Sequence, residues 1–475
     1  MSESVRKNII HYIITVIICF GFGALPPFGD LTPYGMGILG AFLGAIYGWS
    51  TIDMIWPSIV AMVAVGLETG MTKMLGAGIA NPVVAGLLIL FPMFSVLSDL
   101  HVTEWLANKF ITNRFALGRP WVGISIIFLG AFLTSFINTI LVVIIFCTFA
   151  VSLCNNLGIA PYSKFATSLV IGIVYAIMLG QVTVPFIGTG LTFSAAYQGM
   201  FQTPISYGKY LAFIYPAGIV LVLLYVLVMK YIIRVDVSPL KNLTEDMLGA
   251  ATAKLSKDQK KAIIFFLIFV VLVVLSSVLP KDIVIGGVLS NLGFFGICAV
   301  LGAIMMLAKR SNGEPMLNFS KMAEHLPWEA FFMTAFIMVI SAFLTTPETG
   351  LNETIADLIM PMTKLNPWIF IVLVLCFAAI VTNFANNVVL TIVIMPILFN
   401  FGTMVGMNPT GLILILLIVT QLALATPGAS PVTAIAMTYK KIVKVTDMMK
   451  MSLLIIPIML ILSILVCFGW SLVIF

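Results

Sequence analysis

Four clusters of uncharged polar residues interrupt the apolar stretches of this 475-residue chain. TSFINT at 134–139 and TNFANN at 382–387 supply hydroxyl and amide oxygens, whereas PFIGTGLTF at 185–193 and PGASPVTAI at 427–435 add the helix breakers glycine and proline. Neutral oxygens suit a sodium ion, and the free N–H groups at a helix start attract an anion. The clusters therefore have the chemistry of an ion-binding site without fixed charge.

The composition places these clusters inside a membrane. Hydrophobic residues make up 61% of the chain and charged residues 9%, with a mean hydropathy of +1.16, whereas soluble domains carry about 25% charged residues. This excludes a soluble enzyme. The apolar stretches are continuous and do not alternate with period two, which favours helices over a barrel. We therefore predict an all-α polytopic membrane protein.

The apolar stretches predict about 11 transmembrane helices and two re-entrant hairpins. The hairpins, 120–155 and 366–403, have arms of about 14 to 15 apolar residues, which is short for a full crossing. The spans are expected near 9–27, 34–49, 52–67, 82–98, 163–199 (interrupted), 209–233, 262–279, 285–308, 328–346, 410–439 (interrupted) and 449–474.

Loop charges predict the orientation in the membrane. Of the 24 lysines and arginines, 20 fall on the side of the N-terminus, and Lys73, Lys209, Lys281 and Lys364 fall on the other. By the positive-inside rule the N-terminus is cytoplasmic and the C-terminus external, in the cell (plasma) membrane. The basic residues are spread over separate short loops, so we expect membrane lipid and no nucleic acid as a partner.

The polar clusters repeat along the chain. Thr134 and Asn138 align with Thr382 and Asn386 at an offset of 248, and the second pair of clusters aligns at an offset of 241. An amphipathic stretch precedes each hairpin, at 104–115 and 351–362. Because the loop charges place the copies on opposite sides, the sequence predicts an inverted repeat, with broken helices that meet near the midplane.

The site chemistry favours sodium as the coupling ion, because no cluster contains an ionisable residue and proton-driven carriers usually place one within their spans. The absence of an arginine clamp implies that an anion is held by neutral dipoles, helix ends and bound sodium. The sodium ligands are expected to be Thr134, Ser135, Asn138, Thr189, Thr382, Asn386 and Ser430, and the anion is expected to meet Thr139 and Asn387.

Over nearly its whole length the chain resembles the divalent anion:sodium symporter family, which covers dicarboxylate, citrate and sulfate carriers. The first copy of the family's Ser-Asn-Thr hairpin signature falls here on 138–140, or one residue earlier, and the second on 386–388, with Ile140 and Val388 in place of threonine. The broken-helix loops carry Thr192 and Thr433 where the family has asparagine, which adds these two residues to the expected substrate contacts.

The resemblance implies a homodimer in which a transport domain moves against a scaffold, as an elevator. The expected division is 1–118 (scaffold spans and interfacial helix), 119–208 (first transport half), 209–365 (spans and connectors) and 366–475 (second transport half). The altered signature implies an anion that has an apolar portion or fewer charges than a dicarboxylate.

The hypothesis favoured by the sequence is a sodium-coupled secondary active transporter of small di- or monocarboxylate-like anions, and not an enzyme. An anion exchanger would use the same hairpins and remains an alternative. A cation/proton antiporter of the same superfamily should show a buried carboxylate, which the spans lack. A channel or an intramembrane enzyme would need a ring of pore charges or a catalytic constellation.

Overall fold

The computed structural model describes residues 3–201, 205–244, 254–323, 326–344, 346–351, 353–354, 357 and 366–475. Helices form its secondary structure within these ranges, apart from one isolated antiparallel bridge between Lys309 and Pro315. The predicted all-α membrane architecture is confirmed. Most of the predicted second amphipathic stretch, 351–362, and Lys364 lie outside the described residues.

Each predicted span coincides with a helix or with a broken pair of helices. Single helices form most of the spans: α1 (Glu3–Gly21), α2 (Pro33–Thr51), α3 (Trp56–Thr69), α5 (Pro82–Asp99), α11 (Tyr207–Leu227), α13 (Lys257–Val278), α14 (Val284–Leu307), α16 (Trp328–Leu344) and α22 (Val445–Ile474). Helix α14 is kinked at Gly293, where φ is 57° and ψ is −169°. Short helices connect them: α4 (Met71–Ala77), α6 (Val102–Ile111) and α15 (Phe319–Ala323).

The two predicted hairpins are pairs of helices that break at the polar clusters. The first consists of α7 (Pro120–Thr134) and α8 (Thr139–Asn156), and the second of α18 (Pro367–Val381) and α19 (Asn387–Met404). In both copies the first arm has 15 residues and the second has 18. The second arms exceed the predicted length, and α8 and α19 are long and apolar enough to cross a membrane.

The two interrupted spans also break where predicted. One consists of α9 (Lys164–Gly180) and α10 (Gly188–Phe201), and the other of α20 (Pro409–Val419) and α21 (Pro431–Met437). The order of a hairpin followed by a broken span therefore occurs twice, as the repeat predicts. The membrane side that each copy enters from stays a prediction.

Proline and a capping side chain fix where many of these helices begin. Proline at the first helical position lacks only an N–H that would have no partner there, and the preceding side chain accepts a hydrogen bond from the first turn. Thr32 caps α2 in this way, Asn81 caps α5, Asn366 caps α18 and Asn408 caps α20. Local sequence thus sets the starts of α2 and α5, of the second hairpin and of the second broken span.

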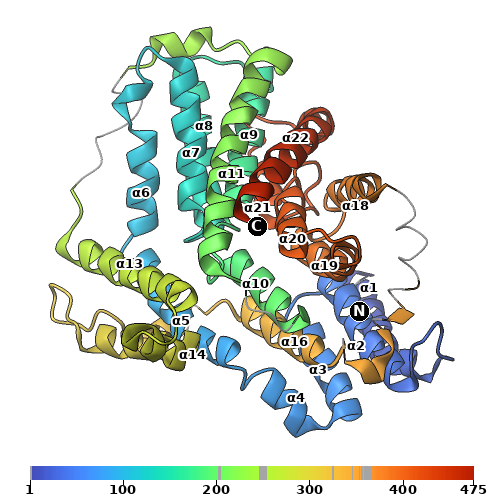
Figure 1. Cartoon of the computed structure of the whole chain (residues 1–475). Helices are drawn as coiled ribbons and strands as arrows, with labels where there is room; N and C mark the ends of the chain where they lie inside the picture. The colour runs from blue at the N-terminus through green and yellow to red at the C-terminus, as the bar shows by residue number, and fades with distance from the viewer. Residues whose placement is uncertain are drawn as a thin grey trace.

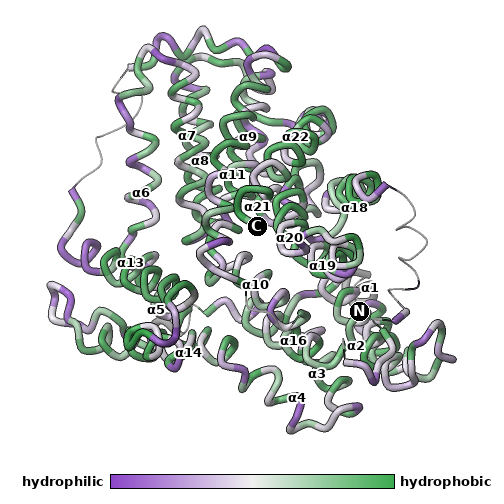
Figure 2. Tube along the Cα trace, in the orientation of Figure 1, coloured by the Kyte–Doolittle hydropathy of each residue, from purple (hydrophilic) through white to green (hydrophobic). Residues whose placement is uncertain are grey.

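Figure 1 shows how the two repeats are packed. Helices α7, α8, α9 and α11 lie side by side, and α21 of the second copy packs against α8 and α9 of the first. Helix α10 leaves this group and packs against α16, which itself contacts α2 and α3. Figure 2 shows apolar residues along the helices and hydrophilic residues concentrated in the connecting segments, as a membrane requires.

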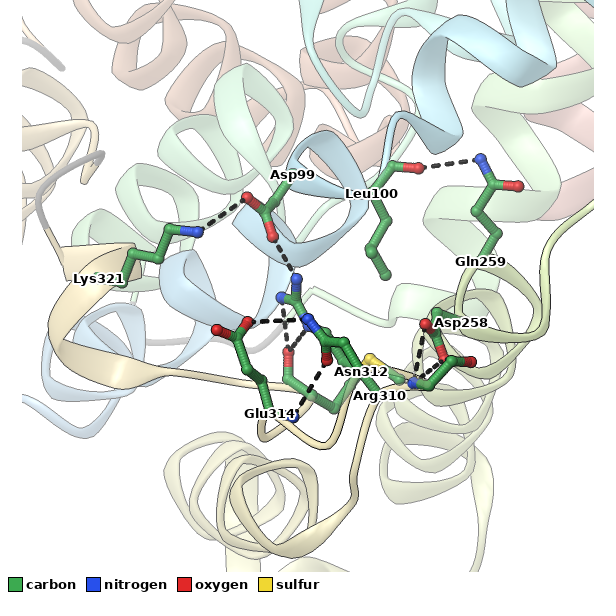
Figure 3. A network of polar contacts seen from close by, with 10 residues as sticks. Asp99, Leu100, Asp258, Gln259, Arg310, Asn312, Glu314 and Lys321 are labelled. Carbon is green, nitrogen blue, oxygen red and sulfur yellow. Dashed lines mark hydrogen bonds and ion pairs between the residues drawn. The ribbon is translucent and has the colours of Figure 1, made fainter.

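A polar clasp joins the end of α5 to the start of α13 and to the segment that follows α14 (Figure 3). Asp99, at the end of α5, accepts a hydrogen bond from Arg310 at 2.7 Å and lies 3.8 Å from Lys321. The next residue, Leu100, accepts a hydrogen bond at 2.9 Å through its carbonyl from Gln259 in the first turn of α13. The start of α6 and the start of α13 are therefore held together.

Candidate ion and anion site

The tip of the first hairpin is organised by its own side chains. Asn138 caps α8 by accepting a hydrogen bond from the Leu141 amide at 3.0 Å, and Thr139 donates to the Ser135 carbonyl at 3.0 Å. The Thr134 and Ser135 hydroxyls are fully buried and donate to carbonyls of α7. Asn138 and Thr139 are partly exposed, so they are the tip residues that can reach a ligand.

The break in the first interrupted span lies directly against this tip. A Cβ atom on Gly180, the last residue of α9, would come within 2.1 Å of both the Phe132 carbonyl oxygen and the Ser135 hydroxyl. Only glycine permits this approach. The chain then bends through 181–187 and starts α10 at Gly188, which has a positive φ of 51°. The free N–H groups of the first turn of α10 therefore begin beside the hairpin tip.

Hairpin tip and broken span together line a first cavity of about 290 Å³. Asn138, Thr139 and Gly188 face it from the repeat, and Phe94 and Ser95 of α5 face it from outside the repeat. Two of the predicted substrate and sodium residues thus share one cavity. Thr192, predicted to contact substrate, instead donates to the Gly188 carbonyl at 3.3 Å and lines no cavity described here.

The tip of the second hairpin has the same cap. Asn386 accepts hydrogen bonds from the amides of Val388 and Val389, at 2.9 and 3.3 Å, at the start of α19. Thr382 is buried and donates to the Thr420 carbonyl at 2.8 Å. Asn387 is buried, with 3% of its surface exposed, at the first position of α19.

Asn383, which the sequence reasoning missed, holds the second break in place. Its Oδ1 accepts hydrogen bonds from the backbone amides of Leu424 at 2.9 Å and Ala425 at 2.8 Å, and its Nδ2 donates to the Ala379 carbonyl. Thr426 donates a further bond to the Asn383 carbonyl. The backbone donors of the non-helical segment are thus satisfied by a hairpin residue 41 positions away.

The second hairpin tip and second break line a second cavity of about 330 Å³. Asn386 and Ser430 face it, together with Trp49 and Ser50 of α2. Ser430 caps α21 by accepting a bond from the Thr433 amide, and Thr433 donates to the Ala423 carbonyl at 2.6 Å. Asn386 and Ser430, both predicted sodium ligands, therefore share one cavity, whereas Thr433 lines neither cavity.

The two halves meet at a pair of glutamines that were also absent from the predicted site. Gln181 Nε2 donates to Gln421 Oε1 at 3.0 Å, and Asn387 Nδ2 donates to the same oxygen at 3.1 Å. A sequence signal did exist, since the glutamines interrupt apolar runs and are 240 positions apart, one less than the repeat offset.

The electrostatics of both cavities are neutral. Among the described residues that line them, none has an ionisable side chain. Helix α8, whose first turn begins at Thr139, and helix α10 each present N-terminal N–H groups with a partial positive charge at the first cavity. The arrangement can coordinate a cation through neutral oxygens and hold an anion through peptide dipoles.

Family models match the chain along both halves. The model described as citrate transporter matches residues 42–297, and the model described as sodium:sulfate symporter transmembrane region matches residues 191–475. The chain belongs to the divalent anion:sodium symporter family. It is therefore a multi-pass membrane transporter and not an enzyme, and its family transports anions with sodium.

Individual relatives agree with this family. An uncharacterized transporter of Haemophilus influenzae is 23% identical over 94% of both chains. The sodium-dependent dicarboxylate transporter SdcS of Staphylococcus saprophyticus is 23% identical over 59% of this chain and 54% of its own length. Among solved structures, MtrF of Neisseria gonorrhoeae, from a class of antimetabolite efflux pumps, has a TM-score of 0.58 at 13% identity, covering 98% of this chain and 94% of that one. This last likeness concerns the fold alone.

Proposed function

We propose that this transporter carries small organic anions, di- or monocarboxylate-like, into the cell with sodium as coupling ion. The observation that carries the proposal is the pair of cavities, each built from a hairpin tip and the break of an interrupted span, with neutral oxygens and no ionisable lining residue among those described. Proton coupling usually needs an ionisable residue within the spans. The sodium and dicarboxylate named for the SdcS relative support the same chemistry.

We assign one sodium site to each cavity, at the residues that offer neutral oxygens. In the first cavity Asn138 and Gly188 are lining residues, and Thr189 follows Gly188 at the start of α10. In the second cavity Asn386 and Ser430 provide an amide and a hydroxyl. Three other predicted ligands donate their hydroxyl hydrogens to backbone carbonyls: Thr134, Ser135 and Thr382. Their role is to offer oxygen lone pairs to sodium or to hold the hairpin tips in shape.

The anion is assigned to the N-terminal ends of α8 and α19. Thr139 and Asn387 occupy the first positions of these helices, where the peptide dipoles favour negative charge. Phe91, Phe94 and Phe136 line the first cavity and provide an apolar wall. An anion with an apolar portion therefore fits this site better than a small, highly charged one.

Transport is proposed to follow an elevator mechanism in a plasma-membrane homodimer, with 119–208 and 366–475 as the moving halves. The packing of α21 against α8 and α9 supports one moving body made from both repeats. The contact of α10 with α16 lies where that body would meet the scaffold.

Proteoliposome uptake tests this proposal. Labelled citrate, succinate, sulfate and lactate are supplied with an inward sodium gradient, and with choline in place of sodium as control. We expect concentrative uptake of at least one carboxylate only with sodium. Uptake that ignores sodium but requires a counter-anion inside would instead establish an exchanger.

A further inference from the structure

The amide contact between Gln181 and Gln421 joins the two repeats at their breaks. Gln181 follows the last residue of α9, and Gln421 lies two residues beyond the end of α20, with 1% of its surface exposed. Their Nε2–Oε1 distance is 3.0 Å. Gln421 is buried and Gln181 is partly buried, so this amide–amide hydrogen bond is partly shielded from competing water.

The orientation of both amides follows from their partners. Gln421 Nε2 donates to the Leu417 carbonyl at 2.9 Å, and a carbonyl can only accept. Gln421 Oε1 must therefore face the other way, toward the NH₂ groups of Gln181 and Asn387. Three amides, from the first break, the second break and the start of α19, are thus connected through one acceptor.

The far end of this chain of amides reaches the first break. Because Gln181 Nε2 faces Gln421, its Oε1 faces Thr189, whose hydroxyl lies 3.5 Å away, at the outer limit of a hydrogen bond. Gln181 and Thr189 are only partly buried, and Gly188 beside them is exposed and lines the first cavity. Gln181 Oε1 therefore keeps acceptor capacity at the edge of the proposed sodium site.

We propose that Gln181 Oε1 is an additional sodium ligand at the first break, and that the Gln181–Gln421–Asn387 amide chain couples sodium binding to anion binding. This inference rests on the proposed sodium-coupled function. A cation at Oε1 polarises the Gln181 amide and strengthens its Nε2 hydrogen bond to Gln421. Gln421 in turn accepts the hydrogen bond from Asn387 at 3.1 Å, at the first position of α19, where we place one end of the anion site.

Coupling of this kind is reciprocal, since sodium must change the affinity for the anion by the same factor as the anion changes the affinity for sodium. A residue that only stabilises the fold would lower both affinities or the amount of folded protein, without changing that factor. The ratio of anion dissociation constants with and without sodium is therefore the decisive quantity.

The test uses purified full-length protein and the carboxylate with the highest uptake among citrate, succinate and lactate. Its dissociation constant is measured in sodium and in choline for the wild type, Gln181→Leu, Gln421→Leu and the double variant. The sodium effect is the ratio of the anion dissociation constant in choline to that in sodium. We expect each single variant to reduce this ratio by about fivefold or more, and the double variant to reduce it no further. Gln198→Leu, a matched change on α10, should retain the full effect.

A second variant separates the ligand role from the coupling role. Gln181→Glu keeps oxygens for sodium but, when ionised, cannot donate to Gln421. We expect this variant to be thermally stabilised at lower sodium chloride concentrations than the wild type, while its sodium effect on the anion is lost. If single leucine variants do not fold, the double variant can be measured in their place, because it removes both glutamines and so leaves neither of them facing an apolar side chain.

The outcomes test the amide coupling and the proposed function separately. A full sodium effect in Gln181→Leu and Gln421→Leu, or in the double variant, overturns the amide coupling and leaves the proposed function intact. A wild type whose anion affinity does not respond to sodium overturns the proposed function itself.

Discussion

Asn383 Oδ1 accepts a hydrogen bond from the Ala425 backbone amide at 2.8 Å, which fixes the second hairpin to the second break. The same oxygen also binds the Leu424 amide, and all three residues are buried. A polar side chain thereby replaces the helical partners that the break removes. In the apolar environment of a membrane protein such donors have no other partner.

Asn383→Ala should therefore be strongly destabilising. The change leaves two buried amides without partners, at a cost of about 2 kcal/mol or more. Thermal unfolding in detergent measures the loss. Asn366→Ala, which removes an exposed cap at the start of α18, should cost about 1 kcal/mol, and equal losses for the two variants would contradict the role assigned to Asn383.

The two cationic partners of Asp99 should contribute unequally to the stability of the protein. Arg310 lies 2.7 Å from Asp99 with 10% of its side chain exposed, and Lys321 lies 3.8 Å away with 57% exposed. Arg310→Met should cost about 1–2 kcal/mol, because it leaves a partly buried carboxylate without its main partner. Lys321→Met should cost less than about 0.5 kcal/mol. Comparable losses in thermal unfolding would show that Arg310 is no more important than a surface charge.

Asn138 and Asn386 should both be needed for sodium coupling. Asn138→Ser and Asn386→Ser keep a capping oxygen for the helix start but remove the amide that faces the cavity. We expect each variant to raise the sodium concentration for half-maximal uptake severalfold while retaining wild-type thermal stability. Uptake driven by an imposed pH gradient, without sodium, would refute this prediction and favour an antiporter.

Cysteine labelling tests the opposite orientation of the two repeats. A cysteine at Lys257, at the start of α13, should react with a membrane-impermeant maleimide only from the cytoplasmic side, and one at Glu353 only from outside. The distribution of basic residues is the physical reason. Reaction of both positions from the same side would overturn the inverted topology.

Competition for uptake tests the nature of the substrate. The apolar residues Ile140 and Val388 follow the hairpin caps, and phenylalanines line the first cavity. We expect monocarboxylates and substituted dicarboxylates to compete more strongly than succinate or sulfate. Stronger competition by succinate would mean that the altered signature does not change selectivity.

The sequence by itself determined the elements and their breaks. Apolar runs predict the spans because lipid requires every backbone group to be paired within a helix. Asn138 and Asn386 mark the hairpin tips because capping depends on neighbours only two or three residues away. The repeat was visible because both copies retain the same polar types at a constant offset.

Only the tertiary structure decided which oxygens share a site. Thr192 and Thr433 have the right chemistry, but their hydroxyls donate to nearby backbone carbonyls. Gln181 and Gln421 become partners because the two breaks are brought together by packing across 240 residues. Such contacts depend on how whole helices are placed, which no local pattern encodes, and a buried amide is a ligand or a structural partner according to that placement alone.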